Sequence, residues 1–330
     1  MKANGAGALA IGACAALLLI FASSAAAQRA EDYPTRPVRI IIPFTPGGPT
    51  DVLGRLVTAR LTEIFGVSVL IDNRPGANGI IGTELVARGA KDGYTMLYTT
   101  GSHAANATMY RKLPYDTVRD FLPITQLART YGQIAVVHPS VPARNLNELI
   151  ALAKAQPGKL NYASAGVGNA THMAAELLFS AANVKLVHVP FKGAGVAMND
   201  VLSGQIEMMF VAAAQGTPFI KAGRIRALGI SGPKRNPALP DVPTFEESGY
   251  PGVVFTGWHG WWFPAGTPRE RALRMQKEVS NVLLSPDMKA KLDDLGLIPV
   301  ANTPDEFAKF VEREIELHAR IAKAAKMEPQ

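Results

Sequence analysis

Short runs of apolar, mostly β-branched residues alternate along this chain with stretches whose apolar positions recur every three to four residues, which is the pattern of strands alternating with helices. The first strand is predicted over 38–44, and after a glycine–proline turn Thr50 or Asp51 is predicted to be the N-cap of a helix. The apolar positions that share one face of this helix are Val52, Leu53, Leu56, Val57 and Leu61. A strand, a helix and a strand follow at 67–71, 80–88 and 94–99. Together these elements predict a βαβαβ unit, half of a doubly wound domain.

A second set of elements begins near residue 133. Its strands are predicted at 134–137, 160–163, 186–189, 207–211 and 226–230. One helix starts at Asn145, whose spacing to Glu148 resembles a capping box, and another covers 170–182. The tail is helical and starts at Thr303, with proline and glutamate at the first and third helical positions. The sequence therefore predicts two closely joined α/β lobes with mostly parallel sheets.

The first 27 residues have the pattern of a secretory signal peptide. Lys2 gives a positive start, 6–21 is an apolar run, and three alanines precede Gln28, so cleavage is predicted after Ala27. The apolar run is short for a membrane span, and no later segment contains about 18 uncharged apolar residues. An alternative is lipidation at Cys14, since the residues before it resemble a lipoprotein cleavage box. The strongest apolar segment follows Cys14, however, whereas that of a lipoprotein precedes its cysteine.

Composition narrows the class of protein. With 48% hydrophobic and 18% charged residues the chain is globular, and its single cysteine excludes a disulfide scaffold and a thiolate metal cluster. The net charge of +7 becomes +6 when cleavage removes Lys2, and the basic residues are dispersed rather than clustered among aromatics. We therefore expect no nucleic-acid partner, and a positive field that favours small anions.

Two glycine turns are the main candidates for chemistry, one in each lobe. They span 44–51 and 163–172, and each joins a strand to a helix start. Unpaired backbone N–H groups and the helix dipole favour an anion there, and two such turns facing each other would hold a molecule with two carboxylates. The alternative is that both are ordinary, well-capped turns.

The sequence gives little support to an enzymatic function or to a metal site. Neither turn has the third glycine of a dinucleotide motif, and Tyr162 replaces the first glycine of a G-x-S-x-G elbow around Ser164. His172 is a poor base for Ser164 because both belong to one loop and helix start. None of the six histidines is paired at metal-ligand spacing, so no metal or cofactor is expected. His188 is interpreted as a packing residue. His103 and His172 are interpreted either as ligand contacts or as loop-packing residues. The aromatic run 258–263 is interpreted as part of the core rather than as a surface on which a ligand stacks.

Several stretches of the chain resemble one known family. They include YPTRPVRIIIPFTPGGPTD, LNYASAGVGNATHMAAELL, HVPFKGAGVAMNDVLSGQIEMMF and FPAGTP, and they run in order from about Tyr33 to the C-terminal helix. The chain is similar to the extracytoplasmic solute receptors of tripartite tricarboxylate transporters, also called Bug receptors. The resemblance implies a type II periplasmic-binding-protein fold, with 33–130 and 250–330 in lobe one and 131–249 in lobe two.

The resemblance also implies a function. Such a receptor is a monomer without enzymatic activity in the periplasm, where it binds a small carboxylate between its lobes and delivers it to membrane transporter subunits. A ligand-sensing partner of a signalling protein, using the same cleft, is the alternative, and a secreted serine hydrolase is a remote one. The positions that match ligand-contacting loops of the family are Phe44, Pro46, Gly47, Gly48, Thr50, Asp51, Ser102, His103, Ser164, Ala165, Gly166, Thr171, His172, Phe191, Lys192 and Gly193.

One position departs from the family pattern. Many relatives have an aspartate after the Met-Phe that ends the predicted strand 207–211, and this chain has Val211. A buried ammonium group without an anionic partner is costly. This predicts a ligand without an amine, either an aliphatic dicarboxylate or an aromatic acid flanked by Phe44, Phe191 and Trp258. The alternative is that Val211 faces the core and has no bearing on the ligand.

Overall fold

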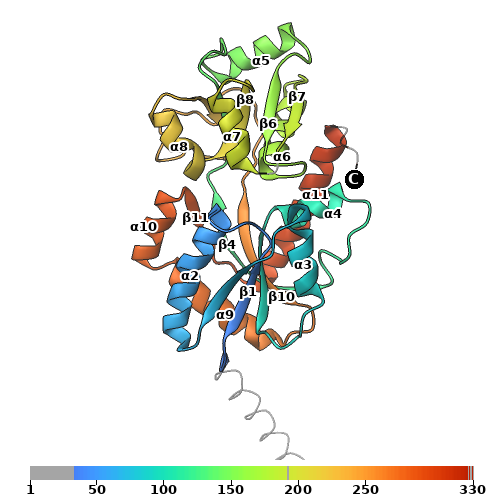
Figure 1. The fold of residues 1–330 in the computed structure, drawn as a ribbon, viewed down its shortest axis with the longest axis vertical. Coiled ribbons are helices and arrows are strands. Elements are labelled where there is room, and N and C mark those ends of the chain that lie inside the picture. Colours follow the sequence, from blue (N-terminus) through green and yellow to red (C-terminus); the bar gives the residue numbers. More distant parts are fainter. Residues whose placement is uncertain (1–32, 192, 326, 328, 330) are drawn as a thin grey trace, which may run out of the picture.

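The computed structural model describes residues 33–191, 193–325, 327 and 329, and these residues form two α/β lobes, one above the other in Figure 1. Each lobe is built on one sheet, and the two sheets share no strand. The α/β class predicted from the sequence is confirmed. The predicted signal peptide, Cys14 and Lys192 lie outside the described residues.

The first sheet has six strands in the order β11-β4-β10-β3-β1-β2. Its strands are β1 (Val38–Ile42), β2 (Val69–Asn73), β3 (Thr95–Thr100), β4 (Phe121–Thr130), β10 (Trp258–Pro264) and β11 (Leu297–Pro299). β1 is parallel to β2 and β3, whereas β10 and β4 are antiparallel to their neighbours. The first sheet is therefore mixed, and the prediction of a mostly parallel sheet is corrected here: within this sheet only the strand pairs of the βαβαβ unit at 38–100 are parallel.

Helices cover both faces of the first sheet. They are α2 (Pro49–Phe65), the short 3₁₀ helix η1 (Ala77–Gly79), α3 (Ile80–Ala87), α4 (Ser102–Met109), α9 (Arg269–Leu283), α10 (Pro286–Asp294) and α11 (Pro304–Ala324). One apolar core lies between the sheet and α2, α9 and α10, and a second lies beside α3, α4 and α11. All of β10 is buried in these cores, which confirms that its aromatic side chains are packing residues.

The second sheet has five strands in the order β7-β6-β8-β5-β9. They are β5 (Gln133–Val137), β6 (Asn161–Ser164), β7 (Val187–Pro190), β8 (Met208–Ala212) and β9 (Arg226–Ile230). Its helices are α5 (Leu146–Ala155), α6 (Ala170–Ala181), α7 (Ala194–Leu202) and α8 (Ala213–Lys221). β6 is parallel to β7 and β8, and β5 is antiparallel to β8 and β9. Both faces again carry an apolar core.

The chain crosses between the lobes twice, and the two crossings are hydrogen-bonded to each other. The first is the short turn between β4 and β5, and the second is the long segment between β9 and β10. Thr130 N–H donates to Gly257 O at 2.8 Å, and Ser231 N–H donates to Gln133 O at 2.9 Å. Val253 and Phe255, in the second crossing, pack in the core of the upper lobe.

Helix α11 also connects the lobes. It starts with the predicted capping box: Glu306 N–H donates to Thr303 Oγ1 at 3.3 Å, and Thr303 N–H donates to Glu306 Oε2 at 2.9 Å. Its first half packs on the lower sheet, and Ile321 near its end is part of the upper lobe's core. Figure 1 shows α11 rising beside both lobes toward α6. Among the described residues, no helix has both the length and the apolar character needed to cross a membrane.

Candidate functional site

Five helices start where parallel strands end. α2 and α4 follow β1 and β3 of the first sheet, and α6, α7 and α8 follow β6, β7 and β8 of the second. Parallel strands that pair side by side present their carboxyl ends at one edge of a sheet, so the helix starts of each lobe gather at one edge. Figure 1 shows these two edges turned toward each other. We call the helix starts on both sides the interlobe junctions.

Four of the interlobe junctions lack a side-chain cap. The N-cap residues of α2, α4, α7 and α8 are Gly48, Gly101, Gly193 and Ala212, none of which carries a side-chain acceptor. The first N–H groups of a helix have no partner within the helix, and the helix dipole adds partial positive charge at the same end. These junctions, which belong to both lobes, therefore favour the binding of an anion.

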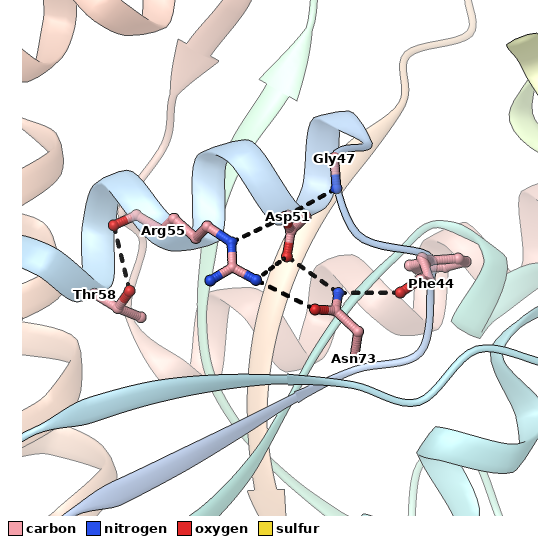
Figure 2. Close-up of polar contacts among 6 residues, drawn as sticks. All are labelled: Phe44, Gly47, Asp51, Arg55, Thr58 and Asn73. Atoms are coloured by element: carbon pink, nitrogen blue, oxygen red, sulfur yellow. Dashed lines mark hydrogen bonds and ion pairs between the residues drawn. The ribbon is translucent and has the colours of Figure 1, made fainter.

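The first glycine loop, at 44–51, is held together by Asp51. Helix α2 begins at Pro49 with Gly48 as N-cap, so the prediction that Thr50 or Asp51 is the N-cap is wrong. Asp51 lies in the first turn, where Oδ2 accepts hydrogen bonds from Gly47 N–H at 3.0 Å and Arg55 Nε at 2.9 Å. Figure 2 shows that its carboxylate also faces Asn73, whose Nδ2 donates to Oδ1 at 3.1 Å.

The Asp51 carboxylate is bound by groups of its own loop, of α2 and of β2. Its side chain is buried beside the Arg55 guanidinium. Burial alone would raise the pKa of this carboxyl, but hydrogen bonds from Arg55, Gly47 and Asn73 hold the pKa below its ordinary value. The carboxylate is therefore charged at neutral pH and compensated by Arg55. Asn73 also donates to Phe44 O at 3.1 Å, so one network ties both ends of the loop together.

The second glycine loop, at 163–172, is held by its own side chains. Asn169 caps α6 by accepting the Thr171 N–H at 3.1 Å. Three further backbone N–H groups find acceptors within the same segment: Ala165 donates to Thr171 Oγ1 at 2.9 Å, Gly166 to Ser164 Oγ at 3.1 Å and Gly168 to His172 Nδ1 at 3.1 Å. For these three groups, and for that of Gly47, the expectation of unpaired donors is wrong. The loop is preorganised instead.

The other predicted site residues differ in their burial and contacts. Phe191 is half-buried beside this loop, and its N–H donates to Ser164 O at 3.0 Å. Gly193 faces open space, since a Cβ placed there would meet nothing within 4 Å. Pro46 is exposed and Thr50 is buried in the first loop. Ser102 opens α4, with its Oγ 3.1 Å from the hydroxyl of Thr100.

Two predicted ligand contacts have side chains that face a core. The His103 ring is buried against Tyr115 and Trp262, and its Nε2 lies 3.1 Å from Thr117 O. Burial lowers the pKa of His103 to about 4, so the ring is neutral. Val211 is fully buried in the apolar core beside α8, opposite Ile134. The prediction that Val211 forms a wall of the ligand site is therefore wrong, and its alternative, that this side chain faces the core, is correct.

A group of residues behind the second loop was not predicted as a unit. The His188 ring stacks on both Tyr162 and His172, with centroid distances of 4.9 and 4.0 Å, and those two rings are themselves 6.3 Å apart. His188 Nε2 is 2.6 Å from Ser164 Oγ, and the Tyr162 hydroxyl donates to Glu176. Only the register of β6 against β7, which sets Tyr162 opposite His188, brings these residues together. Spacing along the chain carries no sign of it.

The second loop reaches the other lobe. A Cβ placed on Gly168 would lie 3.1 Å from Met109 Cγ at the end of α4 and 3.9 Å from Asn78 Nδ2 in η1. At the far side, a Cβ on Gly296 in lobe one would lie 3.0 Å from Ala213 Cβ at the start of α8. The lobes thus touch at both of these places, and in the upper lobe the residues in contact lie beside the starts of α6 and α8.

Two pockets on the outside of the lower lobe do not coincide with these loops. One, of about 540 Å³, lies between α2 and α10, and the other, of about 360 Å³, lies beside α4. No predicted site residue lines either pocket. The two outer pockets are therefore separate from the candidate site at the interlobe junctions.

Comparison with known proteins identifies the family. A family model described as "Tripartite tricarboxylate transporter family receptor" matches residues 53–327, most of the chain. The chain belongs to this receptor family. The resemblance seen in the sequence is thereby confirmed. The chain is also 37% identical over 300 residues to the UPF0065 protein in the tcbD-tcbE intergenic region of Pseudomonas sp. strain P51, covering 91% of this chain and 89% of that one.

Solved structures agree with this assignment. The periplasmic binding protein BugD is 33% identical, with a TM-score of 0.81 over 90% of this chain and all of BugD. R. palustris Rpa4515, solved with adipate, is 35% identical with a TM-score of 0.84 and covers the same shares. MatC from Rhodopseudomonas palustris, solved with malate, is 31% identical with a TM-score of 0.79 over 88% of this chain and 99% of MatC. The chain is therefore a solute-binding receptor with the fold of these proteins.

Proposed function

We propose that this receptor captures a small organic carboxylate between its two lobes. The observation that carries the proposal is the set of interlobe junctions whose N-caps are Gly48, Gly101, Gly193 and Ala212. Helix starts from both lobes offer N–H groups to the same region, and no acidic N-cap competes for them. In this proposal the uncapped starts of α2, α4, α7 and α8 supply the backbone donors, and the preorganised second glycine loop forms part of the wall of the site.

The ligand class we propose is a dicarboxylate. The solved relatives Rpa4515 and MatC were obtained with adipate and malate, which both carry two carboxylates. Helix starts on opposing lobes suit a ligand with a negative charge at each end. Since Val211 faces the core, the argument against an amine on the ligand no longer stands. Aromatic acids remain the second ligand type to test, because Phe44 and Phe191 are half-buried near the two loops.

A calorimetric screen of purified residues 28–330 tests the ligand class. The panel contains malate, adipate, succinate, benzoate, aspartate and glutamate, each titrated at pH 7.5. We expect saturable one-to-one binding of at least one dicarboxylate, with a matching rise in melting temperature. If aspartate or glutamate binds more tightly than the matched acid without the amine, the receptor is specific for amino acids. If no member of the panel binds at millimolar concentration, the proposal is wrong.

The same site has no place for a hydrolase mechanism. Ser164 is fully buried, and its Oγ is engaged by Gly166 N–H and His188 Nε2. A nucleophile must reach its substrate, so this serine serves the loop and not a reaction. A panel of esters with the wild type and Ser164→Ala tests the point, and Ser164-dependent turnover would restore the enzyme hypothesis.

The proposal also includes the location of the receptor in the cell and its partners. Export with cleavage after Ala27 places the mature receptor in the periplasm, where it delivers its ligand to membrane subunits of a tripartite transporter. The receptor acts as a monomer, with 33–130 and 250–330 as lobe one and 131–249 as lobe two. Mass spectrometry of the mature protein tests the cleavage site and would also reveal a lipid on Cys14. Co-purification from membranes with and without malate tests the transporter.

A further inference from the structure

Three aromatic rings form a stack behind the second glycine loop. Tyr162 belongs to β6, His188 to β7 and His172 to α6. The planes of the two imidazoles are 8° apart with centroids at 4.0 Å, and the Tyr162 ring is near-parallel to both, at 18° to His188 and 16° to His172. We call these three residues the histidine stack. It fixes two strands and one helix of the upper lobe relative to one another.

The histidine stack holds the loop through one nitrogen of each imidazole. His172 Nδ1 accepts the Gly168 N–H at 3.1 Å, and His188 Nε2 lies 2.6 Å from Ser164 Oγ. Ser164 Oγ in turn accepts the Gly166 N–H at 3.1 Å. The backbone of the loop is therefore fixed near both of its ends by side chains that lie behind it.

The Gly168 hydrogen bond fixes the proton on His172. An amide N–H only donates, so Nδ1 must be unprotonated, and the neutral ring carries its proton on Nε2. Nε2 faces Glu176 Oε1 at 3.9 Å. Burial, and then the neighbouring His188, lower the pKa of His172 to about 3, which agrees with a neutral ring. The acceptor is thus present throughout the neutral pH range.

Gly168 is the point at which the loop meets lobe one. Its φ is +75°, a left-handed conformation, and the space beside its Cα is occupied by Met109. A loop held in this conformation presents a surface without a side chain to α4. A loop released from it would change both the contact with lobe one and the second-lobe wall of the candidate site.

We propose that His172 is a positioning residue for ligand capture: by accepting the Gly168 N–H it holds the second glycine loop in the conformation that meets lobe one. The inference rests on the proposed capture of a carboxylate between the lobes, which it deepens. His172 does not touch the ligand in this scheme. Its acceptor nitrogen acts through the loop, and its ring acts through the stack with His188.

Two substitutions separate the acceptor from the ring. In His172→Asn, Oδ1 is bonded to Cγ as Nδ1 is in histidine, so an acceptor stays within reach of Gly168 while the stacked ring is lost. In His172→Phe the ring and its volume stay while the acceptor is lost. A purely structural role would make the asparagine variant worse in every measurement, because it leaves a cavity. A positioning role predicts that the phenylalanine variant is worse in loop order and ligand affinity.

The experiment measures amide exchange in residues 164–168 and calorimetric affinity for malate and adipate. For His172→Phe we expect exchange at least tenfold faster than in the wild type and affinity at least tenfold weaker. For His172→Asn we expect both within about threefold of the wild type, despite a lower melting temperature. His318→Phe, which changes a buried histidine on α11, is the matched control and should leave both unchanged.

The outcomes against the proposal are distinct. Unchanged exchange in His172→Phe, or an asparagine variant as impaired as the phenylalanine variant, overturns it. If His172→Phe does not fold, His172→Met takes its place, since a thioether is only a weak acceptor. If the wild type binds neither malate nor adipate, the proposed ligand class fails, but the exchange comparison still decides whether His172 positions the loop.

Discussion

Gly168 of the upper lobe lies against Met109 of the lower lobe, so closely that a Cβ on the glycine would be 3.1 Å from Met109 Cγ. The contact joins the loop after β6 to the end of α4, and a second contact joins Gly296 to Ala213 at the far side. A motion that separated the lobes at these positions would break both contacts. The structure therefore describes an arrangement in which the two lobes touch on both sides.

Ligand binding should favour this arrangement. A molecule that touches both lobes binds the closed form better than the open form and shifts the population toward it. We expect small-angle scattering to show a smaller radius of gyration with saturating malate or adipate than without. An unchanged radius under conditions where calorimetry shows saturation would place the ligand away from the lobe interface.

Substitution at Gly168 should weaken binding through this contact. Gly168→Ala places a Cβ at a left-handed φ, which costs about 1 kcal/mol, and also presses on Met109. Gly158→Ala is the matched control, because φ is +70° there but a Cβ meets nothing within 4 Å. Both variants should lose similar unfolding free energy in denaturant titrations. Only Gly168→Ala should lose affinity, by about threefold to tenfold, and equal affinities would show that the contact has no part in closure.

Gly48 offers a cleaner probe of the first loop than its neighbour. Its φ is −75°, an ordinary value that other residues also adopt, whereas Gly47 has φ +78°. Gly48→Val should therefore fold, with a loss of no more than about 1 kcal/mol at the N-cap. We expect its affinity for malate or adipate to fall at least tenfold, because the side chain covers the start of α2. Normal affinity in the folded variant would remove this loop from the site.

The elements that the sequence predicted well are those whose signal is local. The run 38–44 is β-branched and buried, and the helix after it has a regular apolar face, so β1 and α2 were both expected. The caps at Asn145 and Thr303 were also expected, because a capping box involves residues only three apart. In both cases the observed hydrogen bonds connect the predicted positions.

Long-range pairing explains what the sequence did not show. Strand β4 was missed because it contains Pro123 and two buried polar residues, Thr125 and Gln126. The Thr125 hydroxyl donates to Asn302 O at 2.7 Å, and Gln126 N–H donates to Asn302 Oδ1 at 2.8 Å. A partner more than 170 residues away leaves no trace in the local pattern. The histidine stack was missed for the same reason.

Within the candidate site, residue type predicted the loops better than the side chains. The glycines, prolines and hydroxyls of both loops were expected at strand ends, where they are found. The direction of each side chain depends on the register and on packing. Ligand contact was one of two interpretations for both His103 and Val211, and both side chains are buried in a core. Conversely, His188 was interpreted as a packing residue, although it lies 2.6 Å from Ser164 Oγ.

Acid should destabilise the fold partly through His318 on α11. The ring is buried beside Phe255, and neither nitrogen has a hydrogen-bond partner among the described residues. Burial lowers the pKa of His318 to about 4, against an ordinary value of 6.5. Above pH 6.5 the ring is neutral in both the folded and unfolded states. As the pH falls from 6.5 toward 4, only the unfolded state takes up this proton, so the unfolding free energy decreases.

His318→Phe tests this linkage. The variant lacks the proton uptake, while the other buried histidines contribute equally to both proteins. Between pH 6.5 and 5 we expect the stability of the variant, relative to the wild type in urea titrations, to rise by about 1–2 kcal/mol. A difference that stays constant with pH would mean that His318 is already protonated in the folded state or is not buried there.

The link between Trp258 and Glu314 should carry a measurable and pH-dependent stability. Trp258 opens β10 just after the second crossing, and its Nε1 donates to Glu314 Oε2 on α11 at 2.7 Å. Burial raises the pKa of Glu314 above its ordinary value of 4.5, with the Trp258 hydrogen bond opposing the rise. Trp258→Phe removes the donor and leaves a half-buried carboxylate without it. We expect a loss of about 1–3 kcal/mol of unfolding free energy at pH 8.

The pH dependence shows whether this loss comes from the carboxylate or from packing. Without the donor the protonated form of Glu314 is favoured further, so the folded variant takes up a proton as the pH falls, and the loss should be smaller at pH 5 than at pH 8. Combining Trp258→Phe with Glu314→Leu removes both partners, and the double variant should lose less than the sum of the single losses, by about 1 kcal/mol or more. A packing defect at Trp258 would instead give the same loss at both pH values, and additive losses in the double variant. Urea titrations of the wild type, the two single variants and the double variant at pH 5 and pH 8 distinguish the two explanations. A hydrogen-bonded carboxylate makes the coupling between the start of β10 and α11 depend on pH, whereas a packing defect does not.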